Sequence, residues 1–188
     1  MLDRLDPDEL FAEMTLIPVK FNMATSGLAR NLDPSSTTNG IASGAQLDVP
    51  LYLATGLCRR HIVDIRLPAV YKERYRRKLN AGAECVSFKN MAPYFYEVGS
   101  KCNEFLQDTE LSGFLARTFK TRYHELISKA LNCMSGEEVL QLTSKLSVEE
   151  SLLFEGGRLS ILETERWLKE DVMPSTRPAK RVKSTVRL

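Results

Sequence analysis

The sequence Met91-Ala-Pro-Tyr-Phe-Tyr-Glu-Val-Gly-Ser-Lys101 decides the fold of this chain. Pro93 suits the first position of a helix, because that position needs no backbone N–H donor. Apolar residues then recur at helical spacing, at Phe95, Val98, Gly99, Cys102, Phe105 and Leu106. The three consecutive aromatic residues 94–96 point about 100° apart on a helix, so one inward stripe cannot hold them all. The sequence therefore predicts a helix that is covered on more than one side.

Two more helices and an extended segment are predicted upstream. Residues 47–57 have Pro50 near their start and apolar residues after it, which predicts a helix. Residues 62–67 are expected to be extended, because the residue before Pro68 avoids the helical region. A second helix then runs over residues 68–79, and Asn80-Ala-Gly82 predicts a left-handed cap at its end.

The N-terminal 46 residues predict a small unit that contains strands. Asp6 and Pro7 are typical of a helix start, and this helix should reach about Met14. Residues 17–23 alternate apolar and polar side chains, as a half-buried strand does, and residues 27–32 are a candidate for a second strand. A Gly- and Ser-rich linker follows at residues 33–44. So short a unit buries too little apolar surface to fold alone, so it must pack on something else.

The chain after Lys101 has a helical pattern throughout. Residues 111–131 predict a long helix, and the capping boxes at residues 135–138 and 147–150 predict the starts of two more. Gly156-Gly157 predicts a break or kink in the last of these, before a final helical stretch at residues 158–169. We therefore predict a mainly α protein. Its expected parts are a small N-terminal unit with a helix, strands and linker (1–46), a helical domain (47–172) and a disordered basic tail (173–188).

Three proline-containing segments carry a resemblance to a known family. They are Leu-Asp-Val-Pro-Leu-Tyr-Leu-Ala-Thr-Gly-Leu at 47–57, Arg-Leu-Pro-Ala-Val-Tyr-Lys-Glu-Arg-Tyr-Arg at 66–76 and Lys-Asn-Met-Ala-Pro-Tyr-Phe-Tyr-Glu-Val-Gly-Ser-Lys at 89–101. In this order and at these separations they resemble the third Psf-type subunits of the eukaryotic GINS complex, over about residues 16–169. The resemblance implies a small β-rich domain followed by a larger helical bundle domain.

The same resemblance implies a function in the nucleus. It implies a non-catalytic structural subunit of a heterotetramer that acts in the initiation and elongation of DNA replication. The implied partners are three other GINS subunits, together with the MCM ring and its RecJ-like cofactor in the replicative helicase (the CMG complex). Any contact with DNA would then be indirect.

Composition and motifs exclude several other classes. No apolar run approaches the ~20 residues that a membrane span needs, and the N-terminal sequence lacks the pattern of a secretory signal. His61 and His124 are isolated, and the glycines do not have the spacing of a phosphate-binding loop. The cysteines, which lack a C-x-x-C pair and are expected to be free thiols, are Cys58, Cys85, Cys102 and Cys133. We therefore expect no catalytic, cofactor-binding or metal-binding residues.

Tyrosines and basic residues are the candidate contact residues. The candidates for a partner interface are Tyr71, Tyr75, Tyr94 and Tyr96, because tyrosine is favoured at buried contacts with a wet edge. Packing in the core is the alternative for all four. The basic surface candidates are Lys72, Arg74, Arg76, Arg77 and Lys78. They are compatible with a solvated helix face, with docking to an acidic partner, or with a stand-alone helical DNA-binding module, which is the alternative function.

The net charge is unevenly distributed along the chain. It is −4 over residues 1–50, +6 over 51–130, −5 over 131–172 and +5 over 173–188. This segregation favours docking between charged surfaces over general binding to a polyanion. In the tail, Lys180, Arg181 and Lys183 resemble a short nuclear import signal, with an inert solubilising tail as the alternative.

Overall fold

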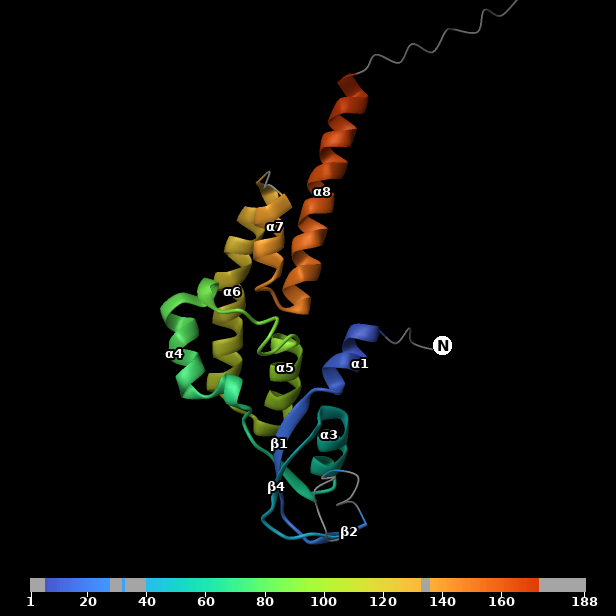
Figure 1. Ribbon diagram of the computed structural model, residues 1–188, viewed down its shortest axis with the longest axis vertical. Helices are drawn as coiled ribbons and strands as arrows, with labels where there is room; N and C mark the ends of the chain where they lie inside the picture. Colours follow the sequence, from blue (N-terminus) through green and yellow to red (C-terminus); the bar gives the residue numbers. More distant parts are fainter. Residues whose placement is uncertain (1–5, 28–31, 33–39, 133–135, 173–188) are drawn as a thin grey trace, which may run out of the picture.

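A small antiparallel sheet forms the N-terminal part of the structure, and helices form the rest (Figure 1). This computed structural model describes residues 6–27, 32, 40–132 and 136–172. The elements in chain order are α1 (Pro7–Glu13), β1 (Leu16–Phe21), β2 (Thr25–Ser26), β3 (Gly40–Ile41), β4 (Gln46–Pro50), α3 (Leu51–Arg59), β5 (Val63–Ile65), α4 (Glu73–Gly82), α5 (Phe95–Leu106), α6 (Thr109–Leu131), α7 (Gly136–Thr143) and α8 (Val148–Val172), with 3₁₀ turns η1 (Ala69–Tyr71) and η2 (Ala83–Cys85). The predicted class, a mainly α protein with a small N-terminal β part, is confirmed.

Strand β1 is the centre of the sheet, whose order is β4-β1-β5 with antiparallel neighbours. Ile17, Val19 and Phe21 alternate toward the core and are fully buried, which confirms most of the half-buried strand predicted at 17–23. The strand ends at Phe21, and Met23 is exposed. The same core cluster includes apolar side chains from α3, and Val98 and Cys102 from α5. The small N-terminal part is therefore anchored on the helical part through α5.

The sheet extends beyond residue 46, the predicted end of the small N-terminal unit, because strands β4 and β5 both belong to it. Residues 46–50, part of which was predicted as helix, form strand β4, whose register with β1 runs from Leu16↔Pro50 to Lys20↔Gln46. The predicted helix begins only at Leu51, because Pro50 both ends the strand and occupies the N-cap. The candidate second strand at 27–32 lies mostly outside the described residues, and the short strand β2 ends just before it.

Two predictions that rested on glycines are wrong. Gly82 is extended, with φ −176°, so it is not a left-handed cap, and the chain passes directly into η2. Helix α8 continues through Gly156 and Gly157 without a break. Glycine suits position 157 because a larger residue would be crowded between α8 and α6, not because the backbone must be flexible there. A Cβ at this position would lie 3.2 Å from the Cβ of Ala130, so glycine allows α8 to approach α6 closely.

Helix α5 lies close to its predicted position, but it begins at Phe95 with Tyr94 at the N-cap, so Pro93 precedes the helix and does not occupy its first position. Its buried residues are Phe95, Val98, Gly99 and Cys102. The ring of Phe95 stacks on that of Phe88, with centroids 4.3 Å apart. It meets the ring of Tyr71 at a tilted angle and that of Tyr96 edge-on. The predicted cover on more than one side is thus confirmed. Gly99 brings α5 close to α6, because a Cβ there would lie 3.0 Å from both methyl carbons of Leu115 and 3.1 Å from the Tyr71 ring.

We expect Gly99→Ala to lower the free energy of unfolding by roughly 1–3 kcal/mol, because the added methyl group would push packed side chains apart. Gly156→Ala is the matched control, since none of the described residues lies within 4 Å of a Cβ at that helical site. It should raise the free energy of unfolding by about 0.4–1 kcal/mol. Urea unfolding followed by circular dichroism measures both. Equal effects of the two substitutions would contradict the close approach at Gly99.

Candidate partner interface

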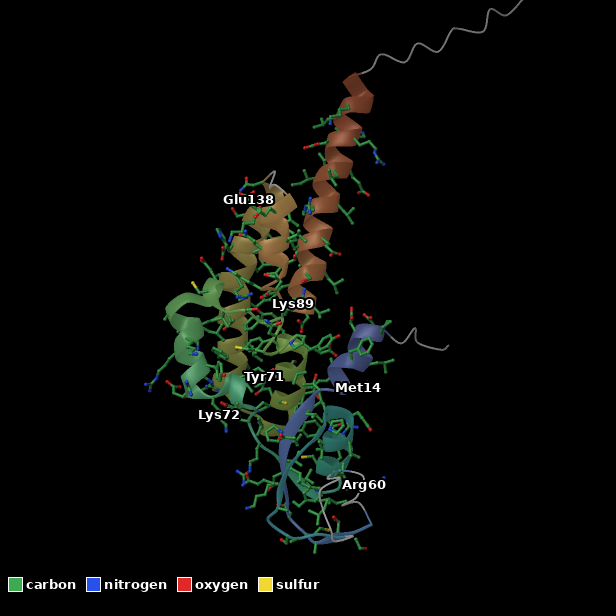
Figure 2. The ribbon with its side chains drawn as sticks, viewed as in Figure 1. Met14, Arg60, Tyr71, Lys72, Lys89 and Glu138 are labelled. Atoms are coloured by element: carbon green, nitrogen blue, oxygen red, sulfur yellow. The ribbon has the colours of Figure 1, made fainter. Side chains whose placement is uncertain are left out.

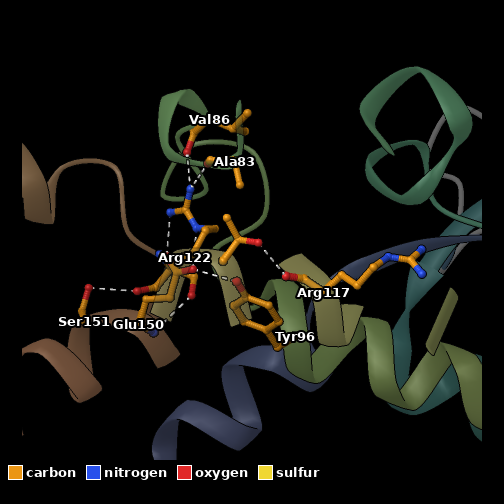
Figure 3. Close-up of polar contacts among 9 residues, drawn as sticks. Ala83, Val86, Tyr96, Arg117, Arg122, Glu150 and Ser151 are labelled. Carbon is orange, nitrogen blue, oxygen red and sulfur yellow. Dashed lines mark hydrogen bonds and ion pairs between the residues drawn. The ribbon is translucent and has the colours of Figure 1, made fainter. Parts of the chain in front are cut away.

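A buried ion pair between α6 and α8 organises the helical part (Figure 3). The side chain of Arg122 is on α6 and that of Glu150 on α8, and the residues are 6% and 2% exposed. The two groups meet in a bidentate contact, with Nε donating to Oε1 at 2.6 Å and Nη2 donating to Oε2 at 2.7 Å. Bidentate guanidinium–carboxylate geometry fixes orientation as well as distance, so this pair sets how α8 lies on α6.

The remaining polar atoms of the pair are also satisfied. Arg122 Nη1 donates to the carbonyl oxygens of Ala83 and Val86, while Glu150 Oε1 accepts from the Tyr96 hydroxyl at 2.7 Å. Burial alone would lower the pKa of Arg122, but the hydrogen bonds and negative charge of Glu150 outweigh it and hold that pKa above its usual value. The pair therefore joins α5, α6, α8 and the turn at residues 83–86.

The predicted capping box at the start of α8 is confirmed. The Glu150 N–H donates to Ser147 Oγ, and the Ser147 N–H donates to Glu150 Oε2, both at 3.2 Å. The sequence predicted this cap but not the ion pair, because Arg122 lies 28 residues away. The other predicted box falls partly on Ser135, outside the described residues.

Glu149 caps a different helix from its own. Tyr94 is at the N-cap of α5, and its side chain makes no capping hydrogen bond in the described structure. Instead, Glu149 Oε1 accepts from the Glu97 N–H at 3.2 Å, which satisfies one of the free donors of that helix end. Burial raises the pKa of the Glu149 carboxyl above its usual value, against the opposing effect of its hydrogen bonds.

The four tyrosine candidates lie in different environments. Tyr71 is 1% exposed, and its hydroxyl donates to the Phe95 carbonyl at 2.8 Å, so it belongs to the core (Figure 2). Tyr75, Tyr94 and Tyr96 are partly exposed. The Tyr96 ring also meets the ring of Phe119 edge-on, with centroids 5.3 Å apart. Tyr71 thus leaves almost no surface to a partner, while the other three retain some.

Arg76 is part of the framework of the helical part. Its Nε donates to the Tyr71 carbonyl at 2.8 Å, and its guanidinium lies 3.4 Å from a carboxylate oxygen of Asp108 and 3.6 Å from one of Glu110. It also lies over the Phe114 ring, 5.4 Å from the centroid. These contacts hold α4 against α6, so this cation is already engaged within the chain.

The other basic candidates differ in how free they are. Arg77 forms an ion pair with Glu73 at 2.8 Å on the surface of α4, and the Lys78 ammonium lies 5.3 Å from the centre of the Tyr75 ring. The remaining two, both exposed, are Lys72 and Arg74. The import candidates Lys180, Arg181 and Lys183 lie outside the described residues.

Large apolar side chains on the outside of the structure form two surfaces that sequence reasoning did not identify. We call the first the α1 surface, made of Leu10, Phe11, Met14 and Leu16, which are 45–63% exposed. We call the second the α8 surface, made of Leu152, Leu153, Leu159, Leu162, Trp167 and Leu168, which are 39–61% exposed. Large apolar side chains that gather on the outside of a protein mark sites of protein interaction.

The described part of the chain shows no group of three or more His, Cys, Asp or Glu placed to hold a metal ion. Among the same residues, no helix combines the length and apolar character of a membrane span. Cys58, Cys85 and Cys102 are free thiols, and burial raises the pKa of Cys102 to about 12. Cys133 lies outside the described residues.

The fold and these surfaces define a class, a helical bundle subunit with a small β part and apolar surfaces suited to assembly. The family model described as the GINS complex protein helical bundle domain, Sld5, matches residues 70–169. The chain is also similar to proteins named DNA replication complex GINS protein PSF3, with 31% identity over 72% of this chain for Bos taurus and 29% over 88% for Homo sapiens. A Dictyostelium discoideum protein with the same name, marked probable, is 24% identical over 87% of the chain.

These matches span 64% of the bovine protein, 80% of the human protein and 60% of the Dictyostelium protein. The chain belongs to the GINS family of DNA replication complex proteins, and within it to the PSF3 type. The family named from the three proline-containing segments is therefore confirmed.

We expect Arg122→Ala to lower the free energy of unfolding by roughly 3–5 kcal/mol, because it would leave the Glu150 carboxylate buried without its cation. The double variant Arg122→Met with Glu150→Leu should cost less, since neither charge then remains. Urea unfolding measures these values. Arg117→Ala on the exposed side of the same helix is the control and should change the free energy by no more than about 0.5 kcal/mol. Similar losses for Arg122→Ala and Arg117→Ala would rule out the organising role of the pair.

Glu149→Gln should become more stable relative to the wild type as pH rises from below the ordinary carboxyl pKa to neutrality. The folded pKa of Glu149 is raised, so its contribution to stability is complete below the unfolded pKa and is lost as pH rises through the folded pKa. The amide does not ionise, yet its oxygen can still accept from the Glu97 N–H. Urea midpoints at acidic and neutral pH test this, with Glu155→Gln on the exposed side of α8 as the matched control. A difference that stays constant with pH would refute it.

Proposed function

We propose that this chain is a non-catalytic structural subunit that holds helical faces against the three other subunits of a heterotetrameric GINS complex. Membership of the family supports the assembly, and the α8 surface is the observation that carries the proposal. Helix α8 has 25 residues and is about 37 Å long at 1.5 Å per residue. Its C-terminal half extends beyond α6 and α7 (Figure 1).

The side of α8 that packs on α6 accounts for only part of its apolar residues. Glu150, Phe154 and Gly157 face α6 or the core around it. Leu152 and Leu159 lie about 180–200° around the helix from Glu150, so they face away from this contact. Burying one large apolar side chain contributes ~1.5–3 kcal/mol. Of the six residues of the α8 surface, Leu152, Leu159 and Leu162 lie within about 80° of one another around the helix. These three could therefore provide much of the binding free energy for a neighbouring helical subunit.

We further propose that the chain acts in the nucleus, in the initiation and elongation of DNA replication, with the MCM ring and its RecJ-like cofactor as wider partners in the replicative helicase. Family membership supports this context. The engagement of Arg76 with Asp108 and Glu110 removes one of the basic candidates from direct contact with DNA. We also propose that the division between the small and helical domains lies after β5, since β4 and β5 both pair with β1.

Co-expression with the three other GINS subunits, followed by size-exclusion chromatography, tests the proposal. The wild-type chain should elute with all three, whereas Leu159→Ser with Leu162→Ser should weaken the association at least about tenfold, because 1.4 kcal/mol corresponds to a factor of ten. Leu140→Ser on α7, at a leucine that is also exposed, is the matched control and should assemble normally. A monodisperse monomer that ignores the other subunits would overturn the proposal.

A further inference from the structure

We propose that the α1 surface and the groove beside it dock a basic amphipathic helix of a partner protein. The proposal concerns residues at the junction of the sheet and the helical part, and it does not depend on the α8 surface. Three observations support it, namely the outward-facing apolar side chains of α1, a groove next to it, and an excess of negative charge among the described residues around α1.

Helix α1 presents its larger apolar residues outward. It is described in full, and its only buried residue is Ala12, a small side chain that packs in the core cluster of the sheet. Leu10 and Phe11 on the helix, and Met14 just after it, are 45%, 57% and 63% exposed. Met14 lies at the edge of the structure where α1 meets β1 (Figure 2). An amphipathic helix normally buries its large apolar side chains, so their exposure on α1 indicates a surface that another protein segment covers.

A groove continues this surface between the sheet and the helical part. It has a volume of about 410 Å³, and its lining includes Leu16, Val70, Met91 and Tyr94. Leu16 belongs both to the α1 surface and to the groove, so the two are continuous. An apolar side chain of a docked helix could enter the groove while neighbouring positions cover Phe11 and Met14. This is how amphipathic helices bind in apolar grooves.

Among the described residues, carboxylates outnumber cations around α1, while the groove is lined by one charged group of each sign, Asp48 and Lys72. Lys101 Nζ lies 3.1 Å from Glu97, 3.2 Å from Glu13 and 3.6 Å from Glu9, so one ammonium group is shared by three carboxylates. The same contacts fasten α1 to α5 and so fix the surface before a partner binds. Burial raises the pKa of the Tyr94 hydroxyl, and the negative charges of Asp8 and Glu149 raise it further.

The combination selects the chemistry of the partner. Lysine or arginine residues flanking an apolar stripe would meet the carboxylates while the stripe covers the α1 surface, so attraction and burial act together. A nucleic acid or an anionic membrane would be repelled by the same carboxylates. A partner helix with acidic flanks would be repelled for the same reason, so charge gives the surface its selectivity.

The test uses the full chain on a soluble carrier protein, free of other subunits, and two synthetic helical peptides. One peptide has leucine at i, i+3, i+4 and i+7 with lysine elsewhere, and the other has glutamate in place of lysine. Fluorescence anisotropy should show binding of the lysine peptide that weakens with added salt, and no comparable binding of the glutamate peptide. No binding of the lysine peptide, or equal binding of both peptides, would overturn the proposal.

Variants then locate the binding site. Phe11→Ser with Met14→Ser should weaken binding of the lysine peptide at least about tenfold, since two exposed apolar contacts are lost. Asp8→Lys should weaken it several-fold at low salt and less at high salt. Leu159→Ser with Leu162→Ser on the α8 surface is the matched control and should leave the affinity unchanged. Circular dichroism confirms folding of each variant. Loss of binding in the α8 variant, with the α1 variants unaffected, would place the site elsewhere and refute the proposal.

Discussion

The buried contact between Arg122 and Glu150 is the constraint on which the helical part depends. A buried ion pair is weak evidence for stability, because the desolvation of two charges offsets much of their attraction. In this structure, the ion pair mainly fixes the orientation of α8 on α6. The bidentate contact, the two carbonyls that accept from Arg122 and the Tyr96 hydroxyl together admit one rotation of α8 about its axis. Once Glu150 faces α6, helical geometry directs Leu152 and Leu159 away from it. The ion pair thus determines which apolar residues remain outside.

Local sequence patterns predicted the elements that depend on local interactions. The stripe of α5, the long helix α6 and the Ser147 cap of α8 were all predicted, because period and capping involve residues close together in the chain. Strand β4 was missed because its identity depends on pairing with β1, about thirty residues earlier. Proline at position 50 is compatible with a strand end and with a helix start, and in this structure it is both. Gly157 was read as a break, but its effect lies in contact with Ala130, which no local pattern reveals.

The contact residues were harder to predict than the elements, and for the same reason. Tyr71 and Tyr94 each follow a proline within three residues, yet one is buried by Phe95 and the other is partly exposed. Arg76 looked like its basic neighbours until the fold placed Asp108 and Glu110 beside it. Helix α8 is apolar on more than one side, so its sequence alone does not tell which leucines face inward. That choice is made by Glu150, whose partner Arg122 is identified only in three dimensions.

The two apolar surfaces differ in the charges that surround them, and this difference affects what each can bind. Along α8 the exposed leucines are interspersed with Glu155, Arg158, Glu163 and Arg166, so the charges there are of both signs and favour no particular partner charge. Among the described residues around α1, the carboxylates of Glu9, Glu13 and Glu97 share the ammonium group of Lys101. In the two proposals, affinity at the α8 surface would therefore come mainly from apolar burial, whereas the α1 surface would add selection by charge. Because the two surfaces use different residues and different chemistry, the two proposed docking sites do not overlap.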